Sequence, residues 1–563
     1  MKILSLHTDY IKFKPLKRAL QSAGVLSDAD KEEKHVENAL AVLTAVEKSD
    51  TDAKGIVAKL VEAVREIAEQ VNVTNIVLYP YAHLSSDLAS PDIATAIFEL
   101  AEKELGKLFR VVKAPFGYYK EFEMKVKGHP LSELSRSISS EGVEEYDAGN
   151  LLREISKSRL DTSKLKDNDH RILGQQMDLF SFNETAPGMV FFHNNGWIIW
   201  NELIKYWREV HRKAGYQEIR TPQILDKRLW QISGHWEKYK ENIFLTEYEK
   251  RGFAVKPMNC PGGMLVYKSR PKSYKELPLR VAELGCVHRQ ELSGVLGGMF
   301  RVVQFVQDDA HIFCTENQIE DEVKRILELV EVIYSKFGLN YRVELSTRPE
   351  KRIGDEKIWD KSEKILESIL KKNKINYKIN EGDGAFYGPK IDFHLKDSLG
   401  REWQTATIQL DMAMPERFEL EYTDKDNKKK RPIMLHRTIL GGVERFYGIL
   451  LEHTNGRLPT WLAPVQVRVL SFTDRNQGYA KKIVKEIGEG IPEVRIDADF
   501  GQETVQSKVK NAEIMRVPYI VVVGDREEKD GKIAVRIRGS KKIEAMDVSD
   551  FISKVREEIE TRR

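Results

Sequence analysis

Residues 287–313, VHRQELSGVLGGMFRVVQFVQDDAHIF, decide the fold of the central part of the chain. Apolar segments flank a glycine-rich turn, and several predicted strands nearby follow one another without a helix, which favours an antiparallel sheet. Even spacing places strand side chains on one face, and the evenly spaced residues are Arg289, Glu291, Arg301, Phe305 and Asp309. Guanidinium forks bind phosphates and an aromatic face holds a base. The alternative is an ordinary hairpin with a solvated face.

A second stretch, HRTILGGVERFYGILLE at residues 436–452, places two glycines before a predicted helix and Arg445 one turn inside it. A helix N-terminus attracts anions, so this arrangement suits phosphate binding. The alternative is a helix whose glycines serve packing and whose arginine is solvated.

Composition limits the classes of protein. The chain has 563 residues, which predicts three to four domains, and its net charge of +3 excludes a histone-like polycation. There is no P-loop motif and no HExxH, GxSxG or CxxC motif. Three cysteines exclude a disulfide framework and fit a reducing, cytoplasmic setting. We expect no secretory signal and no membrane span.

The pattern divides the chain into four parts. Residues 1–137 predict a small α/β unit with an amphipathic helix over 54–71 and a closing hairpin made of LFRVVKAPF and YKEFEMKVK. The polar residues 138–190 predict a linker with one helix at most. Residues 191–464 predict long helices with antiparallel strands. Residues 465–563 alternate strands and helices and predict a small α/β domain with a mixed sheet.

These strings resemble a known family. The spaced residues of 287–313 resemble motif 2 of class II aminoacyl-tRNA synthetases, GGVERFYGILLE resembles motif 3, and the helix ending in GYQEIRTPQI resembles motif 1. KPMNCPG, QDDAHIFC, GAFYGPKIDF, WQTATIQLD, LHRTILG and PTWLAPVQV narrow the resemblance to threonyl-tRNA synthetases over roughly residues 190–563. YPYAHLSSDLASP and APFGYYKEFEMKVKGHPLSELSR resemble the archaeal type of editing domain, which is similar to D-aminoacyl-tRNA deacylases.

The resemblance implies a fold and an activity. The expected architecture is a deacylase-like α/β editing domain, a class II antiparallel sheet with flanking helices, and a small α/β anticodon-binding domain. The expected reaction is ligation of L-threonine to tRNA(Thr) through threonyl-adenylate, with ATP and Mg²⁺, and hydrolysis of L-seryl-tRNA(Thr) by the editing domain. A cytoplasmic homodimer that binds neither membrane nor DNA is expected.

The resemblance also assigns roles to individual residues. The catalytic arginines are expected to be Arg289, Arg301 and Arg445. The ATP site adds Glu291, Phe305 and Gln404, with Lys390 close to the adenylate. Threonine is expected to contact Gln307, Asp309, Tyr387 and Gln409, and one Zn²⁺ per chain to bind Cys260, His311 and His436. The editing residues are His83, Tyr119, Lys120 and Glu133, and the anticodon residues are Glu527 and Arg536, with Arg538 predicted on the same strand face.

Two departures and two rival functions accompany this assignment. Gly263 stands where many relatives carry histidine, and Val303 replaces a common arginine. A regulatory or RNA-binding paralogue without catalysis is one rival. A stand-alone editing factor with a degenerate synthetase body is the other, and it would have lost an arginine of motif 2 or 3 or a zinc ligand. All of these residues are present in the sequence.

Overall fold

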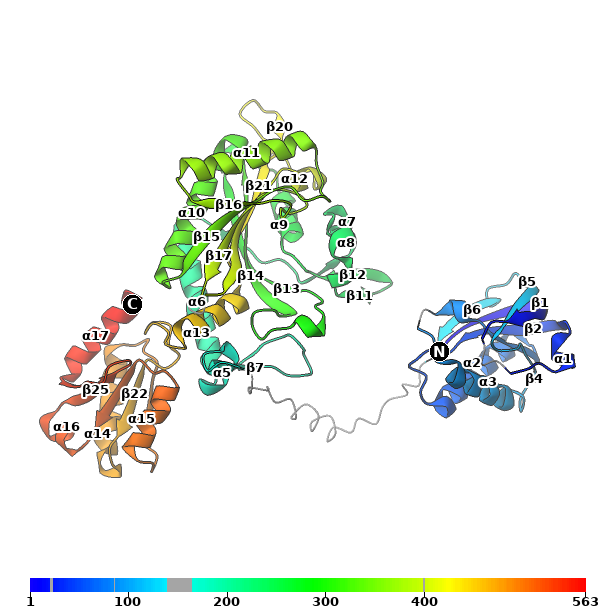
Figure 1. Cartoon of the computed structure of the whole chain (residues 1–563), viewed down its shortest axis with the longest axis horizontal. Coiled ribbons are helices and arrows are strands. Elements are labelled where there is room, and N and C mark those ends of the chain that lie inside the picture. The colour runs from blue at the N-terminus through cyan, green and yellow to red at the C-terminus, as the bar shows by residue number, and fades with distance from the viewer. Residues whose placement is uncertain (21–23, 86, 139–164, 398–399, 563) are drawn as a thin grey trace. The chain divides into compact units, whose positions relative to one another are not determined.

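The computed structural model divides into two compact units, residues 1–151 and 152–563, each described by itself (Figure 1). It describes residues 1–20, 24–85, 87–138, 165–397 and 400–562. Within these ranges no helix is both long and apolar enough to cross a membrane.

The N-terminal unit is a mixed sheet with strand order β4-β3-β2-β1-β5, in which β6 also pairs with β1. Helices α2 and α3 pack together on one face of it (Figure 1). The predicted apolar face of α2 is confirmed, since Ile56, Leu60, Val64 and Ile67 are buried. The elements are β1 (Lys2–Arg18), α1 (Asp28–Lys31), β2 (Lys34–Ala45), α2 (Ala53–Val71), β3 (Asn75–Pro80), α3 (Pro91–Leu105), β4 (Arg110–Lys113), β5 (Tyr118–Val126) and β6 (Glu133–Ser137).

The predicted closing hairpin is wrong. Strand β4 pairs in parallel with β3 at one end of the sheet, whereas β5 pairs with β1 at the other end. Alternating side chains identify a strand, but they carry no information about which strand pairs with it.

Part of the predicted linker belongs to the second unit. Helix α5 (His170–Gln176) follows the undescribed residues 139–164 and precedes the short strands β7 (Phe180–Ser181) and β8 (Phe191–Phe192). Leu173, Met177 and Phe180 are buried in the core of this unit. The segment was predicted to be a linker because it is mostly polar, and only a few apolar residues anchor it in this core.

The second unit is built on an eight-stranded sheet with order β16-β15-β17-β18-β21-β14-β13-β9. Every neighbouring pair from β15 to β13 is antiparallel, as predicted. The strands are β9 (Gln217–Glu218), β13 (Leu279–His288), β14 (Gln304–Cys314), β15 (Asn340–Ser346), β16 (Tyr377–Asn380), β17 (Lys390–Lys396), β18 (Glu402–Asp411) and β21 (Ile433–Gly442).

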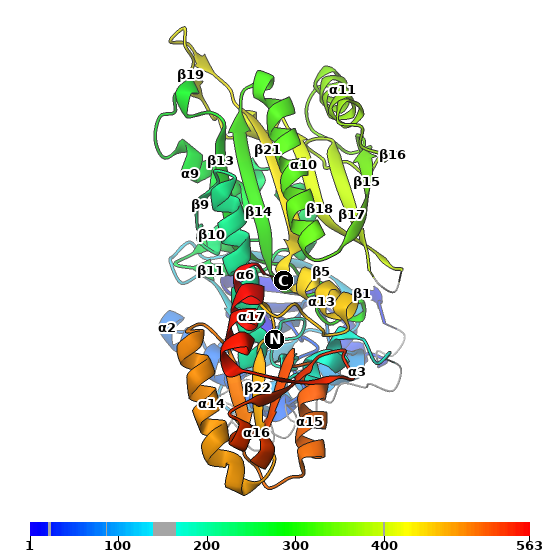
Figure 2. The same ribbon diagram turned by 90° about the vertical axis from the view of Figure 1, so that its left-hand side faces the viewer.

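Long helices cover one face of this sheet. Figure 2 shows α10 lying across β14, β21 and β18, and buried residues of α6 and α10 share one core with these strands. The covering helices are α6 (Asn194–Lys213), α10 (Ile319–Lys336), α11 (Glu356–Lys372) and α13 (Val443–Thr454), whereas α9 (Cys260–Lys268) packs against Val281, Phe313 and Met434 on the opposite face. Smaller elements are β10 (Ile224–Asp226), α7 (Arg228–Ile232), α8 (His235–Tyr239), β11 (Leu245–Tyr248), β12 (Arg251–Val255), α12 (Met414–Arg417), β19 (Tyr422–Thr423) and β20 (Lys429–Lys430).

The C-terminal part has its own mixed sheet with order β23-β22-β24-β25-β26, as predicted. The first three strands are parallel and the last two antiparallel. The elements are β22 (Val467–Ser471), α14 (Gln477–Gly490), β23 (Ile496–Asp499), α15 (Val505–Ile514), β24 (Tyr519–Val523), α16 (Asp525–Asp530), β25 (Ile533–Ile537), β26 (Ile543–Met546) and α17 (Val548–Glu560).

Candidate active site

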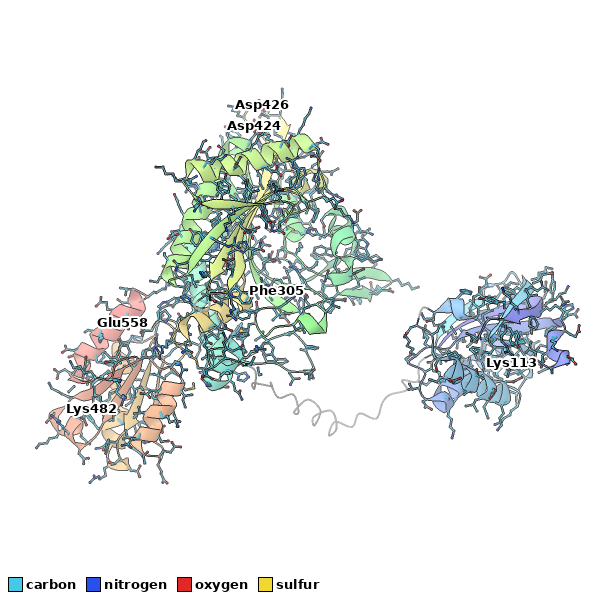
Figure 3. All side chains as sticks on the ribbon, viewed as in Figure 1. Lys113, Phe305, Asp424, Asp426, Lys482 and Glu558 are labelled. Carbon is cyan, nitrogen blue, oxygen red and sulfur yellow. The ribbon has the colours of Figure 1, made fainter. Side chains whose placement is uncertain are left out.

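The face of the core sheet that α10 leaves open carries polar side chains. Along β14, Ala310 and Ile312 are buried in the helix-covered core, while Phe305, Gln307 and Asp309 line a cavity of about 550 Å³. The two sets alternate because successive strand side chains point to opposite faces. Figure 3 labels Phe305 on this sheet.

Motif 2 reaches this cavity from a loop rather than from two strands. Strand β13 ends at His288 and β14 begins at Gln304, so Arg289, Glu291 and Arg301 all lie outside them. All three still line the cavity. The guanidinium of Arg289 lies 5.2 Å from the centroid of the Phe305 ring, and Nε of Arg301 donates to Glu291 at 3.0 Å. The predicted common surface therefore forms, although the predicted strand spacing does not produce it.

A third guanidinium enters from α13. Arg445 lines the same cavity, and its Nε donates to the carbonyl oxygen of Phe300 at 2.9 Å. Burial lowers the pKa of Arg445, and the neighbouring charges of Arg289 and Arg301 lower it further. Three like charges held together and partly removed from water are stabilised by a bound polyanion.

A buried carboxyl fixes α13 against the sheet. Both oxygens of Glu444 accept from the backbone N–H of Val306, at 2.9 and 3.1 Å. Burial raises the pKa of Glu444 to about 8. This contact sets the helix that carries Arg445 beside the strand that carries Phe305.

The other end of the cavity carries uncharged polar side chains and one carboxyl, that of Asp309, and is called the neutral end below. Tyr387 donates to Gln409, and Asp309 accepts from Asn259 at 3.2 Å. Burial raises the pKa of Asp309 to about 6. Oε1 of Gln307 has no hydrogen-bond partner among the described residues. The arrangement offers a small polar substrate an amide, a phenol and a carboxylate.

Between the two ends, Lys390 and Gln404 line the cavity and share one carboxylate. Nζ of Lys390 lies 2.8 Å from Asp392, and Nε2 of Gln404 donates to the same side chain at 2.6 Å. Asp392 and Asn259 are site residues to which the sequence analysis gave no role, although they lie within two strings quoted there, GAFYGPKIDF and KPMNCPG respectively.

Three residues that lie far apart in the sequence form a compact donor set at the neutral end of the cavity. The ligand atoms of Cys260, His311 and His436 all lie within 4.8 Å of one another, and all three residues are buried. The register of β14 and β21 pairs His311 directly with His436, and Cys260 is the first residue of α9. Fold, not sequence spacing, brings them together.

The donor set fits a zinc ion. Nε2 of His311 has no hydrogen-bond partner among the described residues, although it is buried. Nε2 of His436 lies 2.8 Å from Asp411, a carboxylate contact that commonly orients a metal-binding histidine. One thiolate and two imidazoles are ordinary ligands of zinc, and three protein ligands leave one position open.

Two further residues adjoin this set. His235 is buried with Nε2 at 4.0 Å from Sγ of Cys260, and no sequence pattern indicated it. A Cβ atom at Gly263 would lie 3.4 Å from Nδ1 of His311, so glycine leaves that ring uncrowded.

Val303, the other departure from the family pattern, is buried, and its carbonyl oxygen accepts from the N–H of Arg289 at 2.8 Å.

The N-terminal unit has a separate cavity of about 500 Å³. His83, Tyr119 and Lys120 line it, whereas Glu133 lies exposed on β6 and is not part of the lining. Nζ of Lys120 donates to the carbonyl oxygens of Pro115 and Tyr118, at 2.8 and 3.1 Å. It also lies 5.1 Å from the ring centroid of Tyr79. Burial lowers the pKa of Lys120 to about 8.

The predicted anticodon residues are not among the lining residues of either cavity. Glu527 is on α16 and accepts from the N–H of Gly524 at 3.0 Å, while Arg536 on β25 lies 3.3 Å from Glu513. Arg538 follows the end of β25 and donates to backbone carbonyls, including that of Arg516 at 2.7 Å. Arg538 therefore lies one residue beyond the strand on which it was predicted, while its side chain and that of Arg536 both contact the segment 513–516.

Family models match three parts of the chain. Residues 1–138 match the Archaea-specific editing domain of threonyl-tRNA synthetase. Residues 244–454 match the tRNA synthetase class II core domain (G, H, P, S and T), and residues 466–558 match the anticodon binding domain.

Individual relatives agree with these models. The threonine--tRNA ligase of Desulforamulus reducens is 52% identical over 397 residues, which are 70% of this chain and 62% of the relative. That of Thermotoga maritima is 47% identical over 459 residues, 81% of this chain and 69% of the relative. The chain thus spans somewhat less than two thirds of the length of the first relative.

A solved structure, the RNA binding domain of threonyl-tRNA synthetase from Cryptosporidium parvum, superposes with a TM-score of 0.66 at 40% identity. The match covers 69% of this chain and 97% of that one. From its three domain matches and these relatives, the chain belongs to the threonyl-tRNA synthetase family of class II aminoacyl-tRNA synthetases.

Proposed function

We propose that the chain ligates L-threonine to tRNA(Thr) through threonyl-adenylate, with ATP and Mg²⁺, and that residues 1–137 hydrolyse mischarged L-seryl-tRNA(Thr). Residues 165–464 carry out ligation and residues 465–563 bind the anticodon. One observation carries this proposal: the residues expected to bind ATP and threonine all line a single cavity, beside the compact donor set of Cys260, His311 and His436.

In the ligation reaction, the threonine carboxylate attacks the α-phosphorus of ATP in line and pyrophosphate leaves. Arg289 holds the α-phosphate while Phe305, against which it packs, stacks on adenine. Arg301 and Arg445 hold the outer phosphates, and Glu291 fixes Arg301. Positioned charges of this kind lower the barrier by orientation and by stabilising the charge that develops in the transition state.

Threonine occupies the neutral end. Asp309 and Gln307 contact its amino group, and the hydrogen-bonded pair of Tyr387 and Gln409 encloses its side chain. Cys260, His311 and His436 would hold one Zn²⁺, which would act as a Lewis acid for the substrate's amino and hydroxyl groups. A demand for a hydroxyl rejects valine, and polar selection of this kind reaches roughly 10⁴–10⁵.

Serine passes this selection because it differs from threonine by one methyl group, which is worth roughly 10–200-fold. The N-terminal cavity is the site that hydrolyses the resulting seryl-tRNA(Thr). Lys120 is its positive group, and with Tyr119 and His83 it holds the ester end of seryl-tRNA and positions water. The same selectivity problem therefore explains why both cavities occur in one chain.

Anticodon bases are read by Glu527 and Arg536, and the chain works as a homodimer through the motif 1 helix α6. Three cysteines without a disulfide support a cytoplasmic location.

The rival function, that of a stand-alone editing factor, requires a degraded ligation site. Arg289, Arg301 and Arg445 all line an intact cavity, which disfavours it.

Threonine-dependent exchange of labelled pyrophosphate into ATP tests the proposal. We expect exchange with threonine, slower exchange with serine, and very little with valine. Added tRNA(Thr) should then be threonylated. A purified, folded chain that hydrolyses seryl-tRNA but shows no exchange would establish the rival instead.

A further inference from the structure

The loop between β13 and β14 carries three of the proposed ATP residues and is held from one side by α5. The ring of Phe300 in this loop lies 4.3 Å from that of Trp403 and 4.3 Å from that of His170, between centroids. Neighbouring Met299 is fully buried. The loop is therefore anchored at Met299 and Phe300, next to its cavity-facing arginines.

His170 uses both ring nitrogens in this anchor. Nε2 lies 3.0 Å from the backbone N of Met299, and Nδ1 lies 2.6 Å from Oε1 of Glu452. Since a backbone N–H only donates, Nε2 must be the bare acceptor. Nδ1 then carries the proton and donates to Glu452. Asp169, His170 and Glu452 have the proximity of a metal site, but this pairing leaves His170 no free nitrogen for an ion.

The contacts close a ring with α13. Glu452 and Arg445 are seven residues apart on this helix, which places them on one face two turns from each other. Glu452 accepts from His170, His170 accepts from Met299, and the next carbonyl, that of Phe300, accepts from Arg445 at 2.9 Å. The loop is thus clamped between two points of the helix that carries a proposed phosphate ligand.

The fit is close at the neighbouring glycine. Gly298 has φ +55°, and a Cβ atom there would lie 2.2 Å from Nε2 of His170. The backbone approaches the ring at a distance that no other residue allows. Loop and ring are therefore shaped to each other along this contact.

We propose that His170 is a positioning residue for ATP: by accepting from the Met299 amide it fixes the loop so that Phe300 holds Arg445 in its phosphate-binding orientation. The inference rests on the proposed ATP-dependent function. His170 contacts no substrate, so it acts only through Met299, Phe300 and Arg445.

Two substitutions separate the two nitrogens. In His170→Asn the amide nitrogen stands near the position of Nδ1 and keeps the donor to Glu452, but nothing reaches Met299. In His170→Gln the amide oxygen stands near the position of Nε2 and keeps the acceptor for the Met299 amide. Gln175→Ala, an exposed residue of the same helix, is the matched control.

We expect H170N to lower kcat/KM for ATP in the exchange reaction by about 100-fold, the scale of a small misplacement of a positioned group. KM for threonine should stay close to that of the parent, and a cooperative thermal transition should show that H170N is folded, although the unpaired Met299 amide lowers its melting temperature. H170Q should recover activity to within roughly threefold of the parent, and Q175A should match the parent. Equal loss in H170N and H170Q, or an unchanged H170N, would overturn the inference.

Hydrogen exchange of the full chain provides a readout that needs no catalysis. Peptides containing Met299 should exchange about tenfold faster in H170N than in the parent, and at the parent's rate in H170Q. Unchanged protection in H170N would refute the clamp. A parent without pyrophosphate exchange would instead refute the proposed function, while the hydrogen-exchange comparison would still decide the clamp.

Discussion

The two cavities of this chain differ in the number and the type of their cationic side chains. The cavity on the core sheet gathers Arg289, Arg301 and Arg445. Each of these guanidinium groups donates to a backbone carbonyl or a carboxylate. In the N-terminal cavity, Lys120 is the only lysine or arginine among the described lining residues, and its partners are two carbonyls and an aromatic ring.

The difference follows from what each proposed reaction needs. A triphosphate brings several negative charges, so fixed cations stabilise it in every state, and guanidinium groups keep their charge at any physiological pH. An aminoacyl ester is neutral at the bond that breaks. A single half-buried amine suffices there, and its charge depends on pH because burial has lowered its pKa.

The largest expected effect breaks the core cavity alone. Arg289→Ala removes the group that packs on Phe305, and threonine-dependent pyrophosphate exchange should fall by roughly 10²–10³. Hydrolysis of preformed seryl-tRNA should not change. Arg325→Ala, an exposed residue of α10, is the control. Near-normal exchange by R289A would show that the phosphate assignment is wrong.

The second effect breaks the N-terminal cavity alone. Lys120→Ala should slow hydrolysis of seryl-tRNA(Thr) by about 100-fold, in the range of a lost proton-handling or positioning group, with threonylation unchanged. Lys113, labelled in Figure 3, lies on β4 outside the cavity lining and supplies the control Lys113→Ala. Parent-like clearance of seryl-tRNA by K120A would mean that editing occurs elsewhere.

A third substitution tests the metal at the neutral end of the core cavity. Cys260→Ser should reduce bound zinc from one ion per chain to a small fraction, measured by elemental analysis, because a thiolate ligand is lost. Exchange should fall by roughly 10². Cys286→Ser, on β13 away from the donor set, should keep the metal. Full exchange activity in protein free of zinc would contradict the assignment.

The sequence predicted only part of the core cavity. Strand alternation placed Phe305 and Asp309 on one face, because a two-residue period is local information. Cys260, His311 and His436 came from resemblance alone, since only the register of β14 with β21 brings the histidines together.

Contacts between distant segments were missed. His170 lay in a segment predicted to be a linker, yet it contacts Glu452, 282 residues later. In the N-terminal unit, the strand β5 that carries Lys120 was recognised by its alternation, but its partner was not. Pairing is decided by packing of the whole sheet, which no local pattern contains.

The smallest expected effect is the pH dependence of seryl-tRNA hydrolysis, which tests whether the charge of Lys120 is needed in the N-terminal cavity. With a pKa of about 8 instead of 10.5, Lys120 is mostly charged at pH 7 and mostly neutral at pH 9. The charged fraction falls about tenfold over this window. If the charge holds the ester, seryl-tRNA hydrolysis, corrected for the uncatalysed rate, should fall by the same factor. Lys120→Arg should abolish the fall, whatever its absolute rate, because a guanidinium remains charged. A rate that rises through pH 8 would instead assign Lys120 the role of a neutral base.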